Sequence, residues 1–336
     1  MGIYSWIRRV LFLLDAEVSH NLTLLVLKWL NRFGLLRLVL GRPTSKPVRV
    51  MGLTFPNPVG LAAGLDKNGD YIKALSRLGF GFIEIGTVTP RPQAGNAKPR
   101  MFRLPGAQAI INRMGFNNKG VAHLVKQVRA AGHKGIIGIN IGKNFDTPID
   151  NAVDDYLYCL QQVYAYADYI TVNISSPNTA NLRQLQQGDE FQQLLTALSE
   201  ERAVLQLQYQ RYVPIAIKIA PDLNEEQIIG IAEAIKQSKM DAVIATNTTI
   251  SRDNVQGLPH AEEAGGLSGA PVRQMSTQVI NSLHKHLRDI PIIGVGGICS
   301  SEDAEEKFQA GAKLVQLYSG FIYHGPGLIK EIVNKH

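Results

Sequence analysis

From residue 57 onward, short apolar runs rich in β-branched residues recur along the chain, and each ends in glycine or a polar cluster. There are eight of them: NPVGLAAG (57–64), FIEIGTV (82–88), IIGINIG (136–142), YITVNIS (169–175), PIAIKIA (214–220), AVIATNT (242–248), PIIGVGG (291–297) and LVQLYSG (314–320). Nearly continuous apolarity is typical of parallel strands that are covered on both faces. Amphipathic segments lie between most runs, and one of them begins after Asn224, a suitable N-cap residue. The sequence therefore predicts strands that alternate with helices.

Eight strands alternating with helices are the pattern of a (β/α)8 TIM barrel, an α/β fold. The alternative is a doubly wound sheet, which would carry a Gly-x-Gly-x-x-Gly turn after its first strand. Here the first run leads into Leu65-Asp66-Lys67, and the glycines of GVGG lie on the seventh run, where they cannot form that turn. We therefore predict a (β/α)8 TIM barrel that occupies residues 47–336.

Residues 1–46 form a predicted extension of two amphipathic helices with a break at Asp15. Apolar residues recur there at helical spacing: Ile3, Trp6, Ile7, Val10, Leu11 and Leu14, then Val18, Leu22, Leu25, Val26, Trp29, Leu30 and Phe33. The first 50 residues also carry a net charge of +6, out of +7 for the whole chain. Two interpretations stay open: the helices pack on the barrel, or they lie in a membrane interface.

Several other classes of protein fit the composition poorly. No apolar run reaches the roughly 18 residues that a membrane span needs. The basic residues surround no groove or module typical of nucleic-acid binding, so we expect no nucleic acid as a partner. The two cysteines, Cys159 and Cys299, stand in no metal-ligand spacing and favour a reducing compartment.

The segment 89–118, which follows the second predicted strand, is too long for a minimal barrel. It contains two short strand-like pieces, around 101–104 and 109–112. Loops that follow the strands of a barrel lie at its catalytic face. We therefore expect this segment to form a lid or a wall of the site.

Polar residues and glycines gather at the carboxyl ends of the eight predicted strands, which meet at one mouth in a barrel. They are Lys67, Thr87, Asn140, Asn173, Ser176, Asn178, Lys218, Thr246, Asn247, Thr248, Gly296, Gly297, Tyr318, Ser319 and Gly320, and the inserted segment adds Asn112. The set lacks the carboxylate pair of a glycosidase and the ligands of a zinc hydrolase, so no metal site is predicted. Its amides suit a flat ring that carries C=O and N–H groups, such as a pyrimidine or a flavin.

The glycines that end strands seven and eight lie where barrels often bind a phosphate, although tight strand–helix packing is an alternative. A flavin mononucleotide could place its phosphate there and its ring across the mouth, with Lys218 stabilising negative charge on the ring. Lys218 could instead form a Schiff base in a flavin-free lyase. A third hypothesis is a non-catalytic protein of the membrane surface with a vestigial mouth.

Ten motifs, in order, carry a closer resemblance. They are NPVGLAAGLDK (57–67), IEIGTVTPRPQ (83–93), INRMGFNN (111–118), INIGKN (139–144), NISSPNT (173–179), IKIAPD (217–222), ATNTT (245–249), GGLSG (265–269), IIGVGGI (292–298) and LVQLYSGF (314–321). From about residue 10 to the C-terminus, the chain resembles the class 2, quinone-dependent dihydroorotate dehydrogenases of bacteria. This resemblance implies that it oxidises (S)-dihydroorotate to orotate in pyrimidine biosynthesis, with FMN as cofactor and ubiquinone or menaquinone as electron acceptor.

The resemblance also implies two sets of binding residues. The residues implied for FMN are Ala63, Gly64, Leu65, Asp66, Lys67, Thr87, Asn140, Asn173, Lys218, Thr246, Gly269, Gly297, Tyr318 and Ser319. The residues implied for the substrate are Lys67, Asn112, Arg113, Met114, Gly115, Phe116, Asn173, Asn178, Asn247 and Thr248.

Ser176 has no Gly-x-Ser-x-Gly elbow and no histidine close by, so it is not an activated acyl nucleophile. The resemblance implies that Ser176 is the general base that removes the C5 proton of the substrate; without it, a serine turn before Pro177 would be the simpler interpretation. It further implies that the N-terminal helices form the quinone entrance, with His20 and Arg103 on the quinone side of the flavin. We expect a monomer bound peripherally to the cytoplasmic face of the inner membrane.

Overall fold

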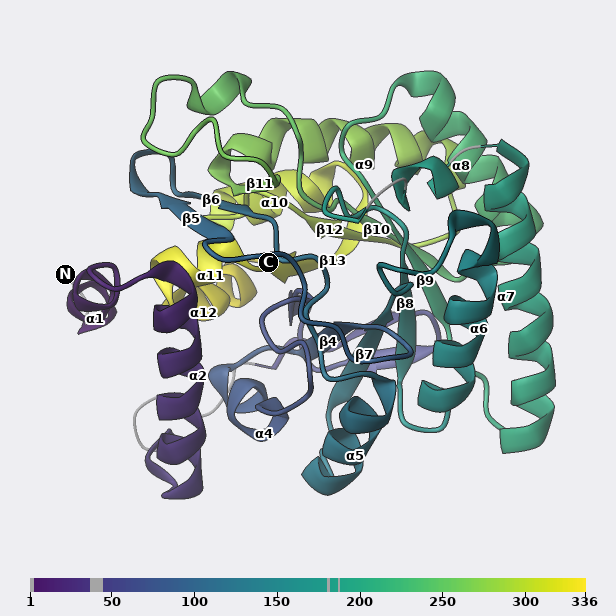
Figure 1. The fold of residues 1–336 in the computed structure, drawn as a ribbon, viewed down its shortest axis with the longest axis horizontal. Coiled ribbons are helices and arrows are strands. Elements are labelled where there is room, and N and C mark those ends of the chain that lie inside the picture. Colours follow the sequence, from purple (N-terminus) through teal and green to yellow (C-terminus); the bar gives the residue numbers. More distant parts are fainter. Residues whose placement is uncertain (1–2, 37–44, 180–181, 187) are drawn as a thin grey trace.

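A closed barrel of eight parallel strands forms the centre of the molecule, as the computed structural model in Figure 1 shows; the structure describes residues 3–36, 45–179, 182–186 and 188–336. The strands are β3 (Val59–Leu61), β4 (Phe82–Val88), β7 (Ile136–Ile141), β8 (Tyr169–Asn173), β9 (Ile215–Ile219), β10 (Ala242–Ala245), β12 (Ile292–Val295) and β13 (Ala312–Leu317). Because β13 pairs with β3 and β10 pairs with both β9 and β12, the ring closes. All eight predicted strands, and with them the TIM barrel, are confirmed.

Helices cover the outside of the barrel. They are α4 (Ile72–Leu75), α5 (Val121–Ala131), α6 (Ala152–Val163), α7 (Gly188–Tyr209), α8 (Glu225–Gln237), α9 (Arg273–Leu287), α10 (Ser301–Gln309), α11 (Ser319–His324) and α12 (Gly327–Lys335). Asn224 caps α8 as predicted: its side chain accepts the Gln227 N–H at 2.9 Å, and the Gln227 side chain accepts the Asn224 N–H in return. The main apolar core lies between these helices and the outward-facing strand residues, such as Ile83 and Ile85.

A small hairpin that the sequence did not predict fills the amino-terminal end of the barrel. Its strands are β1 (Val48–Val50) and β2 (Leu53–Phe55). Phe55 packs edge-on against Phe82, with 5.0 Å between ring centroids. Gly60 makes room for this contact, because a Cβ there would lie 2.2 Å from the Phe82 ring. The described residues therefore close this end of the barrel.

The inserted segment forms a small antiparallel sheet that overlies part of the barrel (Figure 1). The two predicted pieces are strands β5 (Met101–Leu104) and β6 (Ala109–Asn112). A third strand, β11 (Gly266–Gly269), comes from the segment after β10 and pairs Gly266 with Asn112. The sequence reasoning missed this strand, which brings GGLSG beside the inserted segment.

The two N-terminal helices are α1 (Ile3–Leu11) and α2 (Ala16–Arg32), with Asp15 accepting the N–H groups of Glu17 and Val18 as the N-cap of α2. A buried ion pair ties α2 to the inserted segment: Arg100 Nη2 lies 2.8 Å from Glu17 Oε1, and Nε lies 3.2 Å from Oε2. Burial alone would raise the pKa of Glu17, but the Arg100 and Lys98 side chains hold it below its usual value. This bidentate pair fixes the position of α2 against the barrel.

The outer faces of α1 and α2 leave large apolar side chains exposed. We call this surface the outer apolar band; it consists of Trp6, Ile7, Val10, Leu13, Leu14, Val18, Leu22, Leu25, Val26, Trp29 and Phe33. Most of the predicted apolar stripe therefore faces away from the barrel, whereas Glu17 and Leu24 on another face of α2 pack on it, so neither interpretation excludes the other. Within the residues that the structure describes, no helix combines the length and apolarity needed to cross a bilayer.

Lys307 on α10 is a fully buried lysine in the helical layer, with 0% of its surface exposed. Its ammonium group donates to the Arg273 carbonyl and to Thr277 Oγ1 of α9, both at 2.7 Å. Burial lowers the pKa of Lys307 to about 7, although Glu306 and Asp303 oppose the shift. Because the unfolded chain binds this proton up to a pKa of about 10.5, the buried lysine costs stability below that pH.

We predict that Lys307→Met raises the free energy of unfolding by about 1–4 kcal/mol at pH 6.5. The cost of the wild-type lysine is full below its native pKa and fades between about pH 7 and 10.5, so the gain should shrink as pH rises through that window. Urea unfolding at pH 6.5 and 9.5 measures both values, with Lys313→Met, an exposed position on β13, as the control. An equal loss of stability at both pH values would contradict the prediction.

Candidate active site

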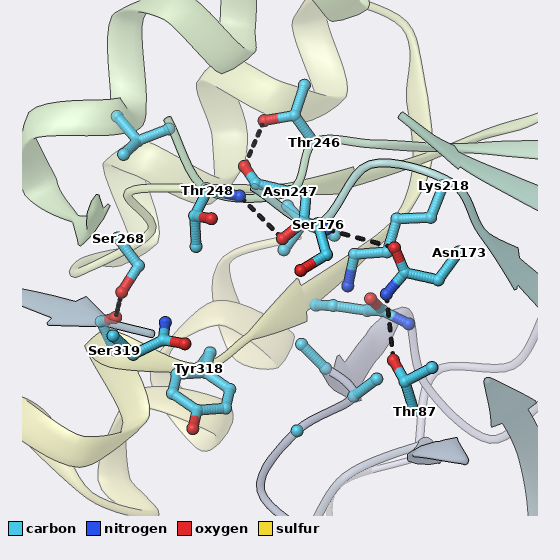
Figure 2. Close-up of a pocket in the computed structure, with 18 of the residues that line it drawn as sticks. Thr87, Asn173, Ser176, Lys218, Thr246, Asn247, Thr248, Ser268, Tyr318 and Ser319 are labelled. Atoms are coloured by element: carbon cyan, nitrogen blue, oxygen red, sulfur yellow. Dashed lines mark hydrogen bonds between the residues drawn. The ribbon is translucent and has the colours of Figure 1, made fainter. Parts of the chain in front are cut away.

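A cavity of about 1050 Å³ opens at the carboxyl ends of the barrel strands. Figure 2 shows side chains from several strands converging on it, among them Ser176, Lys218, Thr248 and Tyr318. The predicted site residues that line it are Ala63, Gly64, Lys67, Thr87, Asn112, Met114, Gly115, Phe116, Asn173, Ser176, Asn178, Lys218, Thr246, Asn247, Thr248, Gly269, Gly297, Tyr318 and Ser319. The structure thus brings residues that are more than 250 positions apart in sequence to one surface.

A chain of side-chain hydrogen bonds holds the amides of the floor in place. Asn247 Nδ2 donates to Asn173 Oδ1 at 3.3 Å, and Asn173 Nδ2 donates to Thr87 Oγ1 at 3.0 Å. Thr87 in turn donates to Asn140 Oδ1 at 2.5 Å. Asn173, Thr87 and Asn140 lie on β8, β4 and β7, and Asn247 lies just after β10, so the network ties the ends of four strands together.

Ser176 follows β8 and is buried, with 5% of its surface exposed. Its Oγ accepts the backbone N–H of Asn178 at 3.2 Å, so the serine turn before Pro177 does form. No hydrogen bond donated by the Ser176 hydroxyl to a described residue is present, and its oxygen points into the cavity (Figure 2). The turn therefore forms while the Ser176 oxygen still points into the cavity.

Arg183, which the sequence reasoning missed, holds the loop that carries Ser176. Its guanidinium donates to the carbonyl oxygens of Ser175 and Thr248, at 3.2 and 2.9 Å, and pairs with Asp222 at 2.8 Å. One planar cation thus joins the loops after β8, β9 and β10. The positions of Ser176 and Thr248 depend on each other through this contact.

Two lysines supply the positive charge of the cavity. Burial lowers the pKa of Lys218, and the negative charge of Glu84 opposes that shift. The Lys218 ammonium group makes no hydrogen bond with any residue that the structure describes. Burial and the positive charge of Arg100 lower the pKa of Lys67 to about 8, and Lys67 donates to the Gly64 carbonyl at 2.8 Å. Both lysines are therefore placed to meet an anionic ligand.

The side of the cavity formed by β11, β12 and β13 exposes bare backbone. Gly297 has φ +73° and lies against Arg273. A Cβ on residue 297 would lie 2.5 Å from the Cα of Arg273, so only glycine fits. Gly296, Gly320 and Ser268, the last bonded to Ser319 at 2.8 Å, line the same side. Such bare N–H groups suit a phosphate. The sequence motifs contained Ser268, but only the pairing of β11 with β6 brings it to the cavity.

Four predicted residues do not line this cavity. Asn140 lies behind Thr87. The Asp66 carboxylate accepts the N–H groups of Asp70 and Tyr71, so it serves a structural turn. Arg113 pairs with Glu263 at 2.7 Å, and Leu65 lines a different cavity. Any ligand contact of these four residues stays a prediction.

A second, mainly apolar cavity of about 660 Å³ lies between the N-terminal helices and the barrel. His20 and Arg103 both line it, together with Leu65. Burial, aided by the charge of Lys67, lowers the pKa of His20 to about 4, so its imidazole is neutral at pH 7. Since Gly64 and Lys67 line the first cavity and Leu65 the second, the segment 64–67 separates the two.

Comparisons with known proteins agree with this geometry. The family model described as dihydroorotate dehydrogenase matches residues 46–335. The dihydroorotate dehydrogenase (quinone) of Methylobacillus flagellatus is 63% identical over 331 residues, 98% of each chain, and that of Thiobacillus denitrificans is 62% identical over 334 residues, 99% of each chain. The crystal structure of DHODH from Eimeria tenella in complex with ferulenol superposes with a TM-score of 0.86 at 36% identity, covering 95% of this chain and 90% of that one. The chain therefore belongs to the dihydroorotate dehydrogenase family, as its sequence motifs predict.

Proposed function

We propose that this chain oxidises (S)-dihydroorotate to orotate, with FMN as hydride acceptor and a membrane quinone, ubiquinone or menaquinone, as the final electron acceptor. The observation that carries the proposal is the pair of cavities on either side of the segment 64–67. The first is the more polar of the two and contains a serine, amides and two lysines, whereas the second is mainly apolar. Such a pair suits a polar reductant and an apolar oxidant that react at one shared group.

The residues of the first cavity fit FMN. The bare backbone at Gly269 and Gly297 suits its phosphate, and Lys218 suits the electron-rich edge of its ring. Gln316 lines the cavity and carries a buried side-chain oxygen without a hydrogen-bond partner among the described residues. A buried acceptor of this kind requires a donor, which a flavin ring supplies. When bound, FMN supplies a hydride acceptor.

The remaining residues fit the substrate, a ring with amide groups and a carboxylate. Asn112, Asn173, Asn178 and Asn247 present side-chain amides at the cavity. Asn178 is held in place by its donation to the Asn112 carbonyl at 3.1 Å. Lys67 supplies a cation for the carboxylate.

Ser176 acts as the base that removes the C5 proton. A serine hydroxyl is a weak base, so its deprotonated form needs stabilisation. The Asn178 N–H, which donates to Ser176 Oγ, favours negative charge on that oxygen. Thr248 lines the same cavity as Ser176 and offers a hydroxyl for passing the serine proton onward (Figure 2).

The extension 1–46 serves as the quinone and membrane side of the enzyme, and residues 47–336 serve as the catalytic barrel. The outer apolar band and nearby basic residues such as Arg8, Arg9 and Lys28 suit insertion into the surface of an anionic bilayer. We infer a monomer bound peripherally to the cytoplasmic face of the inner membrane, with the second cavity beside the lipid.

We predict that Ser176→Ala keeps the yellow flavin band but slows flavin reduction by dihydroorotate at least about 100-fold, the usual loss when a general base is removed. Anaerobic stopped-flow absorbance measures the rate. Ser176→Cys is the matched variant, because a thiol ionises more readily than a hydroxyl and can also act as a base, and it should retain more activity than alanine. A rate for Ser176→Ala within threefold of wild type would rule out the base assignment.

We predict that Thr23→Trp, which fills the second cavity, raises the KM for a short-chain quinone about tenfold or more, equivalent to ~1.4 kcal/mol of lost binding. Reduction of the flavin by dihydroorotate should not change, since Thr23 lies outside the first cavity. Leu22→Trp is the control, because Leu22 is exposed on the outer apolar band of the same helix. Equal quinone kinetics in both variants would contradict the assignment of the second cavity.

A further inference from the structure

Glu84 on β4 is a carboxylate inside the barrel, with 0% of its surface exposed. Strand β4 alternates between the outward-facing Ile83 and Ile85 and an inward-facing set that starts with Phe82. Glu84 belongs to the inward set and lies beneath the floor of the first cavity. A charge in this position is costly unless it is fully compensated, so its presence needs a reason.

Four side chains from three other strands donate hydrogen bonds to this carboxylate. Asn140 Nδ2 lies 2.8 Å from Oε1. Oε2 accepts from the Tyr169 hydroxyl at 2.9 Å, from Thr171 Oγ1 at 3.1 Å and from Gln316 Nε2 at 2.7 Å. Four donors and the nearby positive charge of Lys218 are the surroundings of an ionised carboxylate.

An ionised carboxylate can only accept hydrogen bonds, and this fixes the direction of the bonds above it. Asn140 must point its NH2 group down at Glu84, so its oxygen faces up and accepts from Thr87 at 2.5 Å. Because the Thr87 hydroxyl donates its proton to Asn140, its oxygen accepts from the side-chain NH2 of Asn173, a residue that lines the cavity. The carboxylate thereby sets which atoms the floor presents to a ligand.

The carboxylate of Glu84 also fixes the orientation of the Gln316 amide on β13. Its NH2 group donates to Glu84 and sits 3.3 Å from the Tyr169 hydroxyl. Its oxygen is left as the buried acceptor without a partner among the described residues. A glutamine rotated by half a turn would place that oxygen against the carboxylate, which electrostatic repulsion forbids. Glu84 thus fixes the orientation of the Gln316 amide at the cavity.

Glu84 also lies near Lys218: it accepts a hydrogen bond from Thr171, and the next inward position of β8, Asn173, is the register partner of Lys218 on β9. Among the residues that the structure describes, the lining of the first cavity contains two lysines and no acidic side chain. The attraction between Glu84 and Lys218 crosses the barrel interior, where screening by water is weak. The positive potential that a ring above Lys218 experiences is therefore smaller than Lys218 alone would produce.

We propose that Glu84 is a positioning residue, which fixes the hydrogen-bond direction of the cofactor floor and, by balancing Lys218, lowers the reduction potential of the bound flavin. This inference rests on the proposed FMN-dependent function. A less positive floor makes added electrons less stable on the ring, and so favours their onward transfer to the quinone side.

Glu84→Gln tests both parts, since it keeps the shape and removes the charge. In this variant the NH2 end of the new amide faces a hydrogen-bond donor that the carboxylate oxygen had accepted from. The floor is then disturbed, so the apoprotein should bind FMN about tenfold or more weakly, as fluorescence quenching of added FMN measures. The reduction potential of the reconstituted protein, measured against reference dyes, should become more positive. Glu225→Gln, an exposed glutamate on α8, is the control and should change neither value.

An unchanged or more negative potential in a folded Glu84→Gln protein would overturn the proposal, even if FMN binding weakens, because a purely structural role would affect binding alone. Should that variant fail to fold, Gln316→Leu removes one donor and keeps both charges, and an unchanged FMN affinity in it would overturn the positioning role. If the wild-type protein binds no FMN, the proposed function itself fails, which is a distinct result.

Discussion

Closure of the parallel barrel is the constraint on which the rest of the structure depends. Because β13 pairs with β3, the first and last strands of the ring become neighbours, and all eight carboxyl ends face the same way. Backbone hydrogen bonds of the ladder fix these ends relative to one another, whatever the loops do. The loops then need only short side-chain contacts, such as that of Arg183 with Ser175 and Thr248, to bring their residues into place.

The inside of the barrel is divided along its axis. Aromatic rings and the β1–β2 hairpin fill the amino-terminal end, where Phe55 contacts Phe82. A polar layer around Glu84 lies next, and the first cavity lies above it. A packed apolar base below a polar layer keeps the hydrogen-bond donors and acceptors of the floor in fixed positions. This is the condition under which a protein can tune a bound ring electrostatically.

The sequence predicted the elements that depend on local or repeated residue patterns. Continuous apolarity identified all eight strands, and one asparagine identified the start of α8. The residues of the mouth followed from the fold, since strand ends converge in any barrel.

Three features could not be predicted this way. The pairing of β11 with β6 joins segments about 150 residues apart; Arg183 acts through backbone carbonyls that no motif specifies; and Glu84 is recognisable only once its four donors are seen around it. Whether the apolar stripe of α1 and α2 faces inward or outward also depends on the tertiary structure, because helical spacing is the same in both cases.

We propose that the first cavity holds a flavin that dihydroorotate reduces. The most direct test is the visible spectrum of the purified full-length protein under anaerobic conditions, before and after addition of dihydroorotate. We predict a yellow flavin band that bleaches on addition and returns when a quinone is supplied. A folded, FMN-supplemented protein with no flavin band, or a band that dihydroorotate leaves unchanged, would contradict the account.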